Sequence, residues 1–162
     1  MAVAEELTLI ERRRVEAGVL IPMIRAFQKE LGEERANAIA AEVIRTLARE
    51  QGAAIRERTK IATMSDLQDR MSRGPISEGS LIVDIVEQDA TRFGFNVTRC
   101  KFKELYEEMG AGDLGFILSC NRDFASFEAM APDMQFSRTQ TRMQGADHCD
   151  FRYRVRETEP RA

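Results

Sequence analysis

The chain has 162 residues, of which 43% are hydrophobic and 31% charged, a balance typical of one globular domain. Its formal net charge is −3, so no excess of basic residues is present to cover a phosphate backbone, and we expect no nucleic-acid partner. Acidic and basic residues mixed into the N-terminus exclude a signal peptide, and no apolar run is long enough to span a bilayer. We therefore expect a cytoplasmic protein without a membrane partner.

Helical periodicity predicts that the first 72 residues form a helical leader. Apolar residues recur at three- and four-residue steps over 5–31, and Pro22 predicts a kink or a junction between two helices there. A second helix is predicted over 33–52, because acidic residues at its start suit the positive end of the helix dipole. The range 53–71 predicts a third, more polar helix with a thin apolar edge, typical of a solvated outer helix.

The second half of the chain changes from helical to alternating periodicity. Glycine, proline and serine over 72–80 predict a loop. Beyond it the patterns predict strands 81–89 and 93–100, helices 101–110 and 113–130, and strands 134–144 and 148–156. We therefore expect an α+β fold, with N-terminal helices packed on a small, mainly antiparallel sheet of about four strands and a cysteine-containing core. The single domain over 1–162 would comprise the helical leader 1–72 and the α+β part 81–157.

All three cysteines and the only histidine lie in the C-terminal half. An odd number of cysteines in a reducing compartment argues against a disulfide framework and leaves free thiols or metal ligands. Each cysteine has charged residues close by in the sequence: Arg99 and Glu104 near Cys100, Arg122 and Asp123 after Cys120, His148 and Asp150 on either side of Cys149. A plain apolar core would not need these charges, so we expect the functional site here.

The neighbours of Cys120 favour covalent catalysis, with this residue as the nucleophile or essential thiol. A guanidinium or imidazolium near a thiol lowers its pKa, and the thiolate is the competent nucleophile. Asp123 lies at the edge of the helix face that Cys120 shares with Phe124 and Phe127, and His148 titrates close to working pH. We therefore assign Asp123 and His148 to proton transfer. The alternatives are cysteines that pack as small hydrophobes and a lone surface histidine.

Cys149 is a further catalytic candidate, because it lies on the core-facing side of its predicted strand. The same three thiols are also candidate metal ligands: Cys100, Cys120 and Cys149 with a histidine or aspartate could hold zinc or manganese tetrahedrally. No pair has CxxC or HxxxH spacing, so the sequence leaves the divalent metal and any other cofactor open.

Arginines next to hydroxyl and amide side chains suggest that the substrate carries a carboxylate. A guanidinium fork binds a carboxylate through two parallel hydrogen bonds, which assigns Arg122 and Arg138 to substrate binding. Ion pairs of these arginines with Asp123 or Asp150 are the structural alternative, and the residues alone do not separate the two.

The motifs NVTRC, LSCNRDF, RTQTRMQGA and HCDFRY, in that order, resemble the L-2-amino-thiazoline-4-carboxylic acid hydrolase family, and the N-terminal helices resemble its helical leader. The resemblance implies hydrolytic opening of a cyclic amidine, the thiazoline ring, to N-carbamoyl-cysteine, with attack at the ring carbon between nitrogen and sulfur by a thiolate or an activated water. We therefore expect a hydrolase that acts on a carbon–nitrogen or carbon–sulfur bond of a small cyclic amidine or amide. Matching positions beyond those already named add Asn121, Thr139, Thr141 and Glu104, which we assign to substrate binding.

The cysteine-bearing half also resembles, more distantly, the 4-vinyl reductase type of small-molecule-binding domain. This resemblance implies an alternative function, a non-catalytic module that binds a small molecule or a metal. In either case the expected partner is a small molecule, and a homo-oligomer in contact through the Arg-rich, polar helices is a further expectation.

Overall fold

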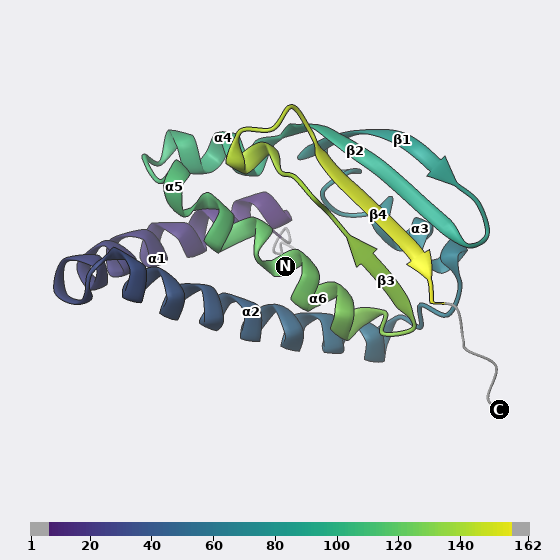
Figure 1. Cartoon of the computed structure of the whole chain (residues 1–162), viewed down its shortest axis with the longest axis horizontal. Coiled ribbons are helices and arrows are strands. Elements are labelled where there is room, and N and C mark those ends of the chain that lie inside the picture. Colours follow the sequence, from purple (N-terminus) through teal and green to yellow (C-terminus); the bar gives the residue numbers. More distant parts are fainter. Residues whose placement is uncertain (1–6, 157–162) are drawn as a thin grey trace, which may run out of the picture.

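The computed structural model describes residues 7–156, which begin with two long antiparallel helices (Figure 1). Helix α1 (Leu9–Leu31) starts at a capping box, in which the Thr8 hydroxyl accepts a hydrogen bond from the Glu11 N–H while the Glu11 carboxylate accepts one from the Thr8 N–H. The predicted junction between two helices at Pro22 is wrong, because α1 continues through Pro22 as one helix, while the predicted kink stays a prediction. Pro22 and Gly18 are both exposed, so water can satisfy the Gly18 carbonyl that proline leaves without a donor.

Helix α2 (Glu33–Arg58) passes through Gly52, where the sequence predicts its end. The predicted helix over 53–71 is therefore wrong in its extent: its first residues belong to α2, and only Met64–Met71 form the separate helix α3. Helix α3 starts at a second capping box, in which the Thr63 side chain and Asp66 satisfy each other's backbone N–H groups. As predicted, residues 72–80 contain neither helix nor strand.

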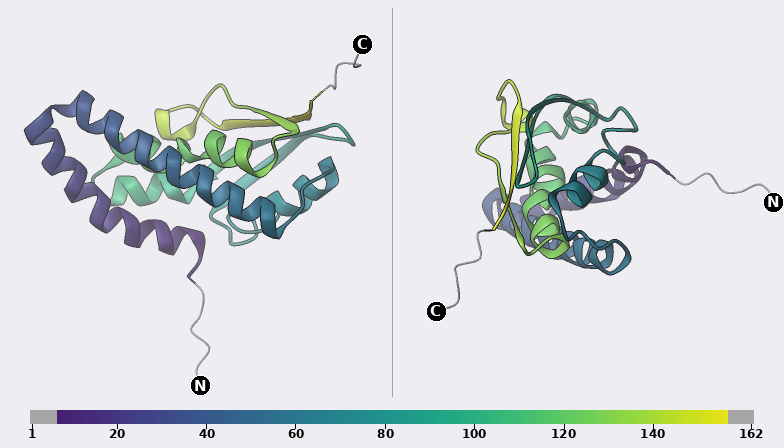
Figure 2. Two further views of the ribbon diagram at one scale, coloured as in Figure 1. Left: turned by 90° about the horizontal axis from the view of Figure 1, so that it is seen from below. Right: turned by 90° about the vertical axis from the view of Figure 1, so that its right-hand side faces the viewer.

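The four strands form one antiparallel sheet, which confirms the predicted α+β class. Its strand order is β1 (Leu81–Gln88), β2 (Arg92–Cys100), β4 (Cys149–Val155) and β3 (Met134–Ser137). Helices cover one face of this sheet, and the other face is open to solvent (Figure 2). In the same views α6 lies between α2 and the sheet, so the structure has a sheet layer, an inner helix and an outer helical hairpin.

The segment between β2 and β3 is helical but not as one regular α-helix. It contains α4 (Lys101–Glu108), α5 (Gly112–Gly115), the π-helix η1 (Phe116–Cys120) and α6 (Arg122–Met130). The Asn121 N–H donates to the carbonyl of Phe116, five residues earlier, at 2.9 Å. A π turn adds a residue and rotates the following helix relative to the preceding one.

This rotation corrects the helix face predicted for 113–130. Phe127 is buried as predicted, whereas Phe124 is 38% exposed. Leu118 before the rotation belongs to a core cluster with α1, α2 and α5, while Phe127 after it belongs to a second cluster with the sheet and α3. The π turn therefore joins the two cores, and Cys120 lies at this junction.

The strand predicted over 134–144 is also shorter, because β3 ends at Ser137. The backbone N–H groups of Thr139 and Gln140 donate to the Asp150 carboxylate, at 2.9 Å each, rather than to a neighbouring strand. Beyond them the chain forms a short 3-10 helix, η2 (Arg142–Gln144). Among the residues described, no helix combines the length and apolarity required to cross a membrane.

Gly52 allows the backbones of α2 and α6 to approach closely, and this contact predicts a large effect on stability. A Cβ at this position would overlap the carbonyl oxygen of Ser126, a backbone atom that cannot move aside. We expect Gly52→Ala to lower the free energy of unfolding by about 3 kcal/mol, measured by urea denaturation. The matched control is Gly18→Ala, in the interior of α1 with no atom within 4 Å of its Cβ position. It should stabilise the protein by up to about 1 kcal/mol, and equal effects of both substitutions would contradict the prediction.

Candidate functional site

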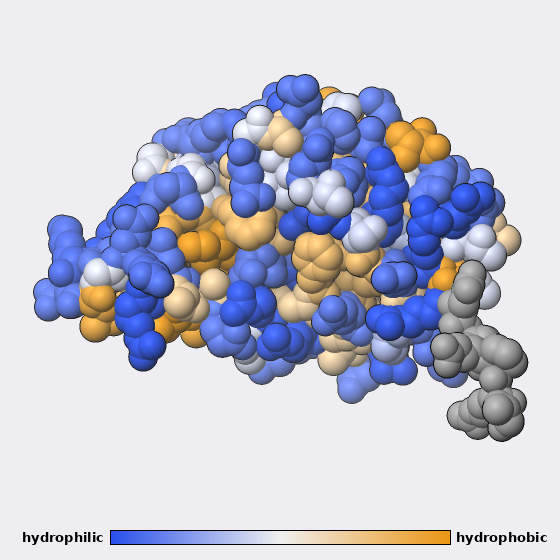
Figure 3. Space-filling model, viewed as in Figure 1, coloured by the Kyte–Doolittle hydropathy of each residue, from blue (hydrophilic) through white to orange (hydrophobic). Residues whose placement is uncertain are grey.

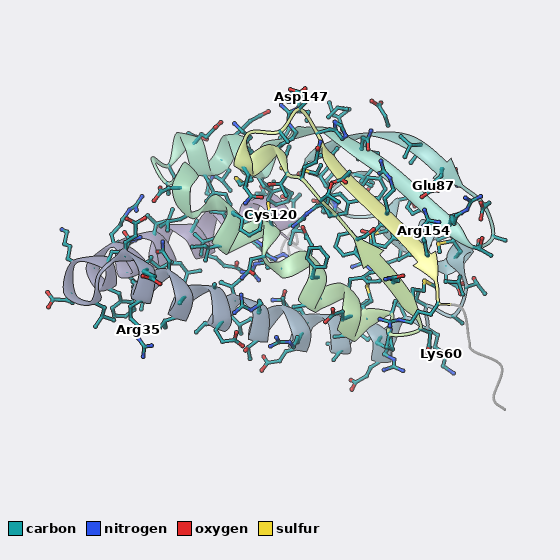
Figure 4. All side chains as sticks on the ribbon, in the orientation of Figure 1. Arg35, Lys60, Glu87, Cys120, Asp147 and Arg154 are labelled. Carbon is teal, nitrogen blue, oxygen red and sulfur yellow. The ribbon has the colours of Figure 1, made fainter. Side chains whose placement is uncertain are left out.

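A cavity of about 650 Å³ that opens to solvent lies between α1, the C-terminal part of α2, the segment 74–78, the sheet and the start of α6. All three cysteines line it, together with Asp123, Arg122 and Arg138. Cys120, labelled in Figure 4, lies in the middle of the molecule at the end of the π turn. The structure therefore brings together six of the residues that the sequence assigns to the site.

Cys120 is 8% exposed, so its thiol is largely shielded from water. Burial raises the pKa of Cys120, the negative charge of Asp123 raises it further, and Arg138 opposes the rise. The direction is opposite to the lowered pKa expected from the neighbouring arginines in the sequence. The Asp123 carboxylate compensates the positive charge of Arg138, so the desolvation that raises the pKa of Cys120 outweighs the guanidinium that lowers it.

The other two thiols share this property. Cys149 lies opposite Val97 in the β2–β4 ladder, and its sulfur accepts a hydrogen bond from the Arg142 N–H at 3.2 Å. Burial raises the pKa of Cys149 despite this bond. Cys100 is half-buried at the start of α4, and burial raises its pKa as well, opposed by the backbone N–H of Lys103. A thiolate in this cavity therefore requires a base that removes the proton.

Asp123 and Arg138 form an ion pair at the side of the cavity next to Cys120. The Arg138 side chain is only 3% exposed, and it also donates to the Cys120 carbonyl at 3.1 Å. Its guanidinium lies over the rings of Phe124 and Phe151, at 5.4 and 5.3 Å from their centroids. These contacts fix Arg138, and Arg138 in turn fixes the Asp123 carboxylate.

The carboxylate of Asp123 is enclosed by protein but reachable from the cavity, with 36% of its side chain exposed. Enclosure raises the pKa of Asp123 above its ordinary value, and the charge and hydrogen bond of Arg138 oppose this rise. A carboxylate with a raised pKa is a stronger base than an exposed one, which suits it to accept a proton from a thiol or from water.

A second charged cluster in the cavity consists of Arg13, Glu16 and Arg122. Arg13 donates to both Glu16 carboxylate oxygens at 2.9 and 2.8 Å, and Arg122 donates to one of them at 3.1 Å. Both arginines are at most 8% exposed. Two guanidinium groups thus share one carboxylate, and the Arg122 Nη1 atom has no hydrogen-bond partner in the part of the chain that is described. Burial and the charge of Arg13 both lower the pKa of Arg122, as expected for an excess of positive charge.

The cavity as a whole is positively charged, although the chain has a net charge of −3. Its lining contains six arginines but only three acidic residues: Arg12, Arg13, Arg58, Arg70, Arg122 and Arg138, against Glu16, Glu78 and Asp123. Apolar side chains such as Leu81, Val97 and Phe102 complete the lining. The cavity is therefore suited to a small anionic molecule with an apolar part.

Five residues assigned to the site from the sequence do not line the cavity. Glu104 pairs with Arg99 on the surface at 2.8 Å, and the Asn121 amide donates to the Ala41 carbonyl at 2.9 Å. The other three belong to the segment around η2: Thr139 donates to Asp150, Thr141 caps η2, and His148 accepts a bond from Gln140 through its backbone carbonyl. These contacts give structural roles to the side chains of Glu104, Asn121, Thr139 and Thr141, while the His148 side chain is half-buried outside the cavity.

Arg13 and Glu16 were not predicted from the sequence as site residues. Arg13 lies four residues before Ala17 and eleven before Ile24, in register with the buried side of α1. A charged residue at a position of the buried face is a signal that could have identified it. The larger apolar residues lie on another side of α1 and predict that this other side is buried, so periodicity alone does not indicate that Arg13 is buried.

The three cysteines do not form a metal site. Although they line one cavity, no three histidine, cysteine, aspartate or glutamate side chains within residues 7–156 converge closely enough to hold an ion. The donors are of a type that zinc binds, but their arrangement does not bring them around one ion.

Comparisons with known proteins agree with this description of the fold and identify the family. No curated protein matches the chain. Its fold is similar to that of a trafficking protein particle complex subunit 3 from Naegleria fowleri, solved covalently bound to palmitic acid, with a TM-score of 0.51 and 8% identity. That similarity covers 93% of this chain and 98% of the other. The sequence model of the L-2-amino-thiazoline-4-carboxylic acid hydrolase family matches residues 12–153. Since this match covers most of its length, the chain belongs to the L-2-amino-thiazoline-4-carboxylic acid hydrolase family.

Proposed function

We propose that the protein hydrolyses a small cyclic amidine that carries a carboxylate, with 2-amino-thiazoline-4-carboxylate as the reference substrate and an N-carbamoyl amino acid as the product. The observation that supports this proposal is the cavity with a thiol and a carboxylate at one side and two buried arginines that share one carboxylate at another. In an amidine that carries a carboxylate, the amidine carbon would lie next to the thiol and the carboxylate next to the two arginines.

The Arg13–Glu16–Arg122 cluster is proposed to bind the carboxylate of the substrate. Its two guanidinium groups exceed its one carboxylate by a single positive charge, which a substrate carboxylate would neutralise. The two arginines are buried, whereas 38% of the Glu16 side chain is exposed, so water and salt screen the attraction only in part. Glu16 keeps the two like charges together when the cavity contains no substrate.

Cys120 and Asp123 are proposed to carry out the reaction at the ring carbon between nitrogen and sulfur. Asp123 accepts the proton of the Cys120 thiol as its sulfur attacks this carbon, and Arg138 holds Asp123 in place. The ring carbon–sulfur bond then breaks, and the departing sulfur takes up a proton. Water attacks the carbon attached to Cys120 and releases the enzyme thiol. The product carbon keeps both nitrogens and gains the oxygen of water, so one water molecule is consumed for each carbamoyl group formed.

The activity can be tested directly, because ring opening releases a thiol. We expect purified protein to convert 2-amino-thiazoline-4-carboxylate to N-carbamoyl-cysteine, followed by a thiol reagent and by mass spectrometry of the product. Loss of ammonia would indicate cleavage of the carbon–nitrogen bond outside the ring. Cleavage of the ring carbon–nitrogen bond would give an S-carbamoyl isomer of the same mass, which the thiol reagent distinguishes because it has no free thiol. No thiol release under any condition at which the substrate binds would contradict the proposed reaction.

Arg13→Gln is expected to raise KM at least about tenfold for the carboxylate substrate, because a charge-assisted hydrogen bond contributes about 1.5–3 kcal/mol. It should have little effect on 2-amino-2-thiazoline, which lacks the carboxylate. The matched control is Arg14→Gln, next in the sequence, whose side chain forms an exposed ion pair with Glu108. Equal increases in KM for the two substrates would show that Arg13 only maintains the structure.

A non-catalytic binding module is the second candidate function. Burial raises the pKa of all three thiols, and a thiol with a raised pKa is a poor nucleophile. This property favours binding without catalysis. The fold neighbour from Naegleria fowleri, with its bound palmitic acid, shows that a protein of this fold can hold a small molecule. This function predicts that the protein binds anionic heterocycles in calorimetry without turning any of them over.

A further inference from the structure

The α1–α2 hairpin exposes a row of large apolar side chains that the described structure leaves uncovered. We call these residues the hairpin stripe: Val15, Val19, Met23, Phe27 and Leu31 on α1, with Ile39, Val43 and Leu47 on α2. Each is between 40% and 65% exposed. Figure 3 shows apolar surface at the end of the molecule that this hairpin forms.

The spacing makes the stripe a continuous surface rather than scattered contacts. Its members follow one another at intervals of four residues along each helix, so they form two rows. The buried residues of these helices, such as Ala17, Ile24 and Ile44, point elsewhere, into the core below α1 and α2. The helices that carry the two rows run antiparallel and lie side by side in the hairpin (Figure 1).

The exposed area of the stripe is close to what a stable interface requires. Eight large side chains, each about half exposed, present roughly 700 Å² of apolar surface, more than the largest patch on a typical monomer and close to the ~800 Å² that each partner buries in a standard interface. Burial of such a surface is the main favourable contribution to protein association.

The charges at the ends of the α2 row select a second copy of the chain as the partner. Arg35 lies four residues before Ile39, and Glu50 lies three residues after Leu47. Neither forms an ion pair with any residue in 7–156, and Arg35 points outward from the hairpin (Figure 4). If α2 packs antiparallel against α2 of a second copy, each Arg35 meets the Glu50 of the other, as two-fold symmetry requires.

We propose that the protein is a two-fold symmetric dimer, in which the hairpin stripes of two copies pack face to face as a four-helix arrangement with antiparallel α2 helices. This contact is apolar, in contrast to the Arg-rich, polar contact expected from the sequence.

Light scattering after gel filtration tests the proposal at protein concentrations of tens of micromolar. The wild type should have twice the chain mass of 18.4 kDa, and Val43→Glu, in the middle of the α2 row, should have the mass of one chain. The matched control is Val86→Glu, an equally exposed valine on β1, which should remain dimeric. Circular dichroism establishes that both variants are folded.

A charge exchange tests the packing without altering the apolar surface. Arg35→Glu and Glu50→Arg should each weaken the dimer at least about fivefold, and the double variant should restore it, measured as Kd by sedimentation at low salt. A dimer that Val43→Glu leaves intact would overturn the proposal. A wild-type protein with the mass of one chain would also overturn the proposal. Binding of that monomer to phosphatidylcholine vesicles or to another protein through the hairpin stripe would then assign the stripe to that partner.

Discussion

Cys120→Ser is expected to lower kcat for 2-amino-thiazoline-4-carboxylate by at least about 10³-fold, because a serine hydroxyl is a much weaker nucleophile at the same position. The substitution removes little volume from a side chain that is already 8% exposed, so the fold should be preserved. The measurement is the rate of thiol release at saturating substrate, together with mass spectrometry of wild-type enzyme quenched during turnover. The covalent adduct should map to Cys120.

The matched control for this prediction is Cys100→Ser, which alters another thiol of the same cavity. Cys100 is half-buried and lies at the start of α4 rather than beside the Asp123–Arg138 pair, so kcat should change less than threefold. Full activity of Cys120→Ser would exclude covalent catalysis by this residue. The attacking group would then be a water molecule, with Asp123 as its base.

Asp123→Asn is expected to lower kcat by about 10²–10⁴-fold, the usual range for loss of a general base. The amide has nearly the same shape as the carboxylate but accepts no proton. The matched control is Glu128→Gln, which removes an exposed carboxylate from the same helix outside the cavity and should leave kcat unchanged. Unchanged activity of Asp123→Asn would assign proton transfer to another group.

The pH dependence follows from the ionisation of Asp123. The base must be ionised, so kcat should fall as the pH drops through the pKa of Asp123, which burial raises above the ordinary value of about 3.9. Because Arg138 lowers this pKa, Arg138→Gln should move the acidic limb to higher pH. Asp123→Asn should abolish the limb. An acidic limb that neither substitution moves would belong to a different group.

The sequence predicted the secondary structure well where a local signal is strong. The β1–β2 hairpin, the short helix α4 and the final strand β4 follow from periodicity alone, as does the α+β class. The helix boundaries at Gly52 and within 113–130 could not be predicted in this way. At Gly52 the reason is a contact with Ser126 on α6, and in the second case it is the π turn, which changes the phase of the helix.

Only part of the candidate site was predicted, because contacts between distant segments also decide which residues line the cavity. Residues close to the cysteines in the sequence were assigned to it together, yet Thr139 and Asp150 bind each other, and the His148 side chain does not line the cavity. Arg138 lies fifteen residues after Asp123, and only the return of the chain through β3 brings the two together. Proximity in the sequence is therefore a weak guide to which charges share a cavity.

The sequence by itself determined the helical and strand periods, the grouping of the three cysteines with Asp123 and Arg122, and the motifs that identify the family. Only the tertiary structure decided which side of α1 faces the interior, because periodicity defines an apolar face but not the element that covers it. It turned the large apolar residues of α1 outward and placed Arg13 and Glu16 in the cavity, where Glu16 pairs with Arg122, 106 positions later in the sequence. The physical reason is that charge pairing and packing between distant segments depend on the whole chain, whereas periodicity depends only on neighbouring residues.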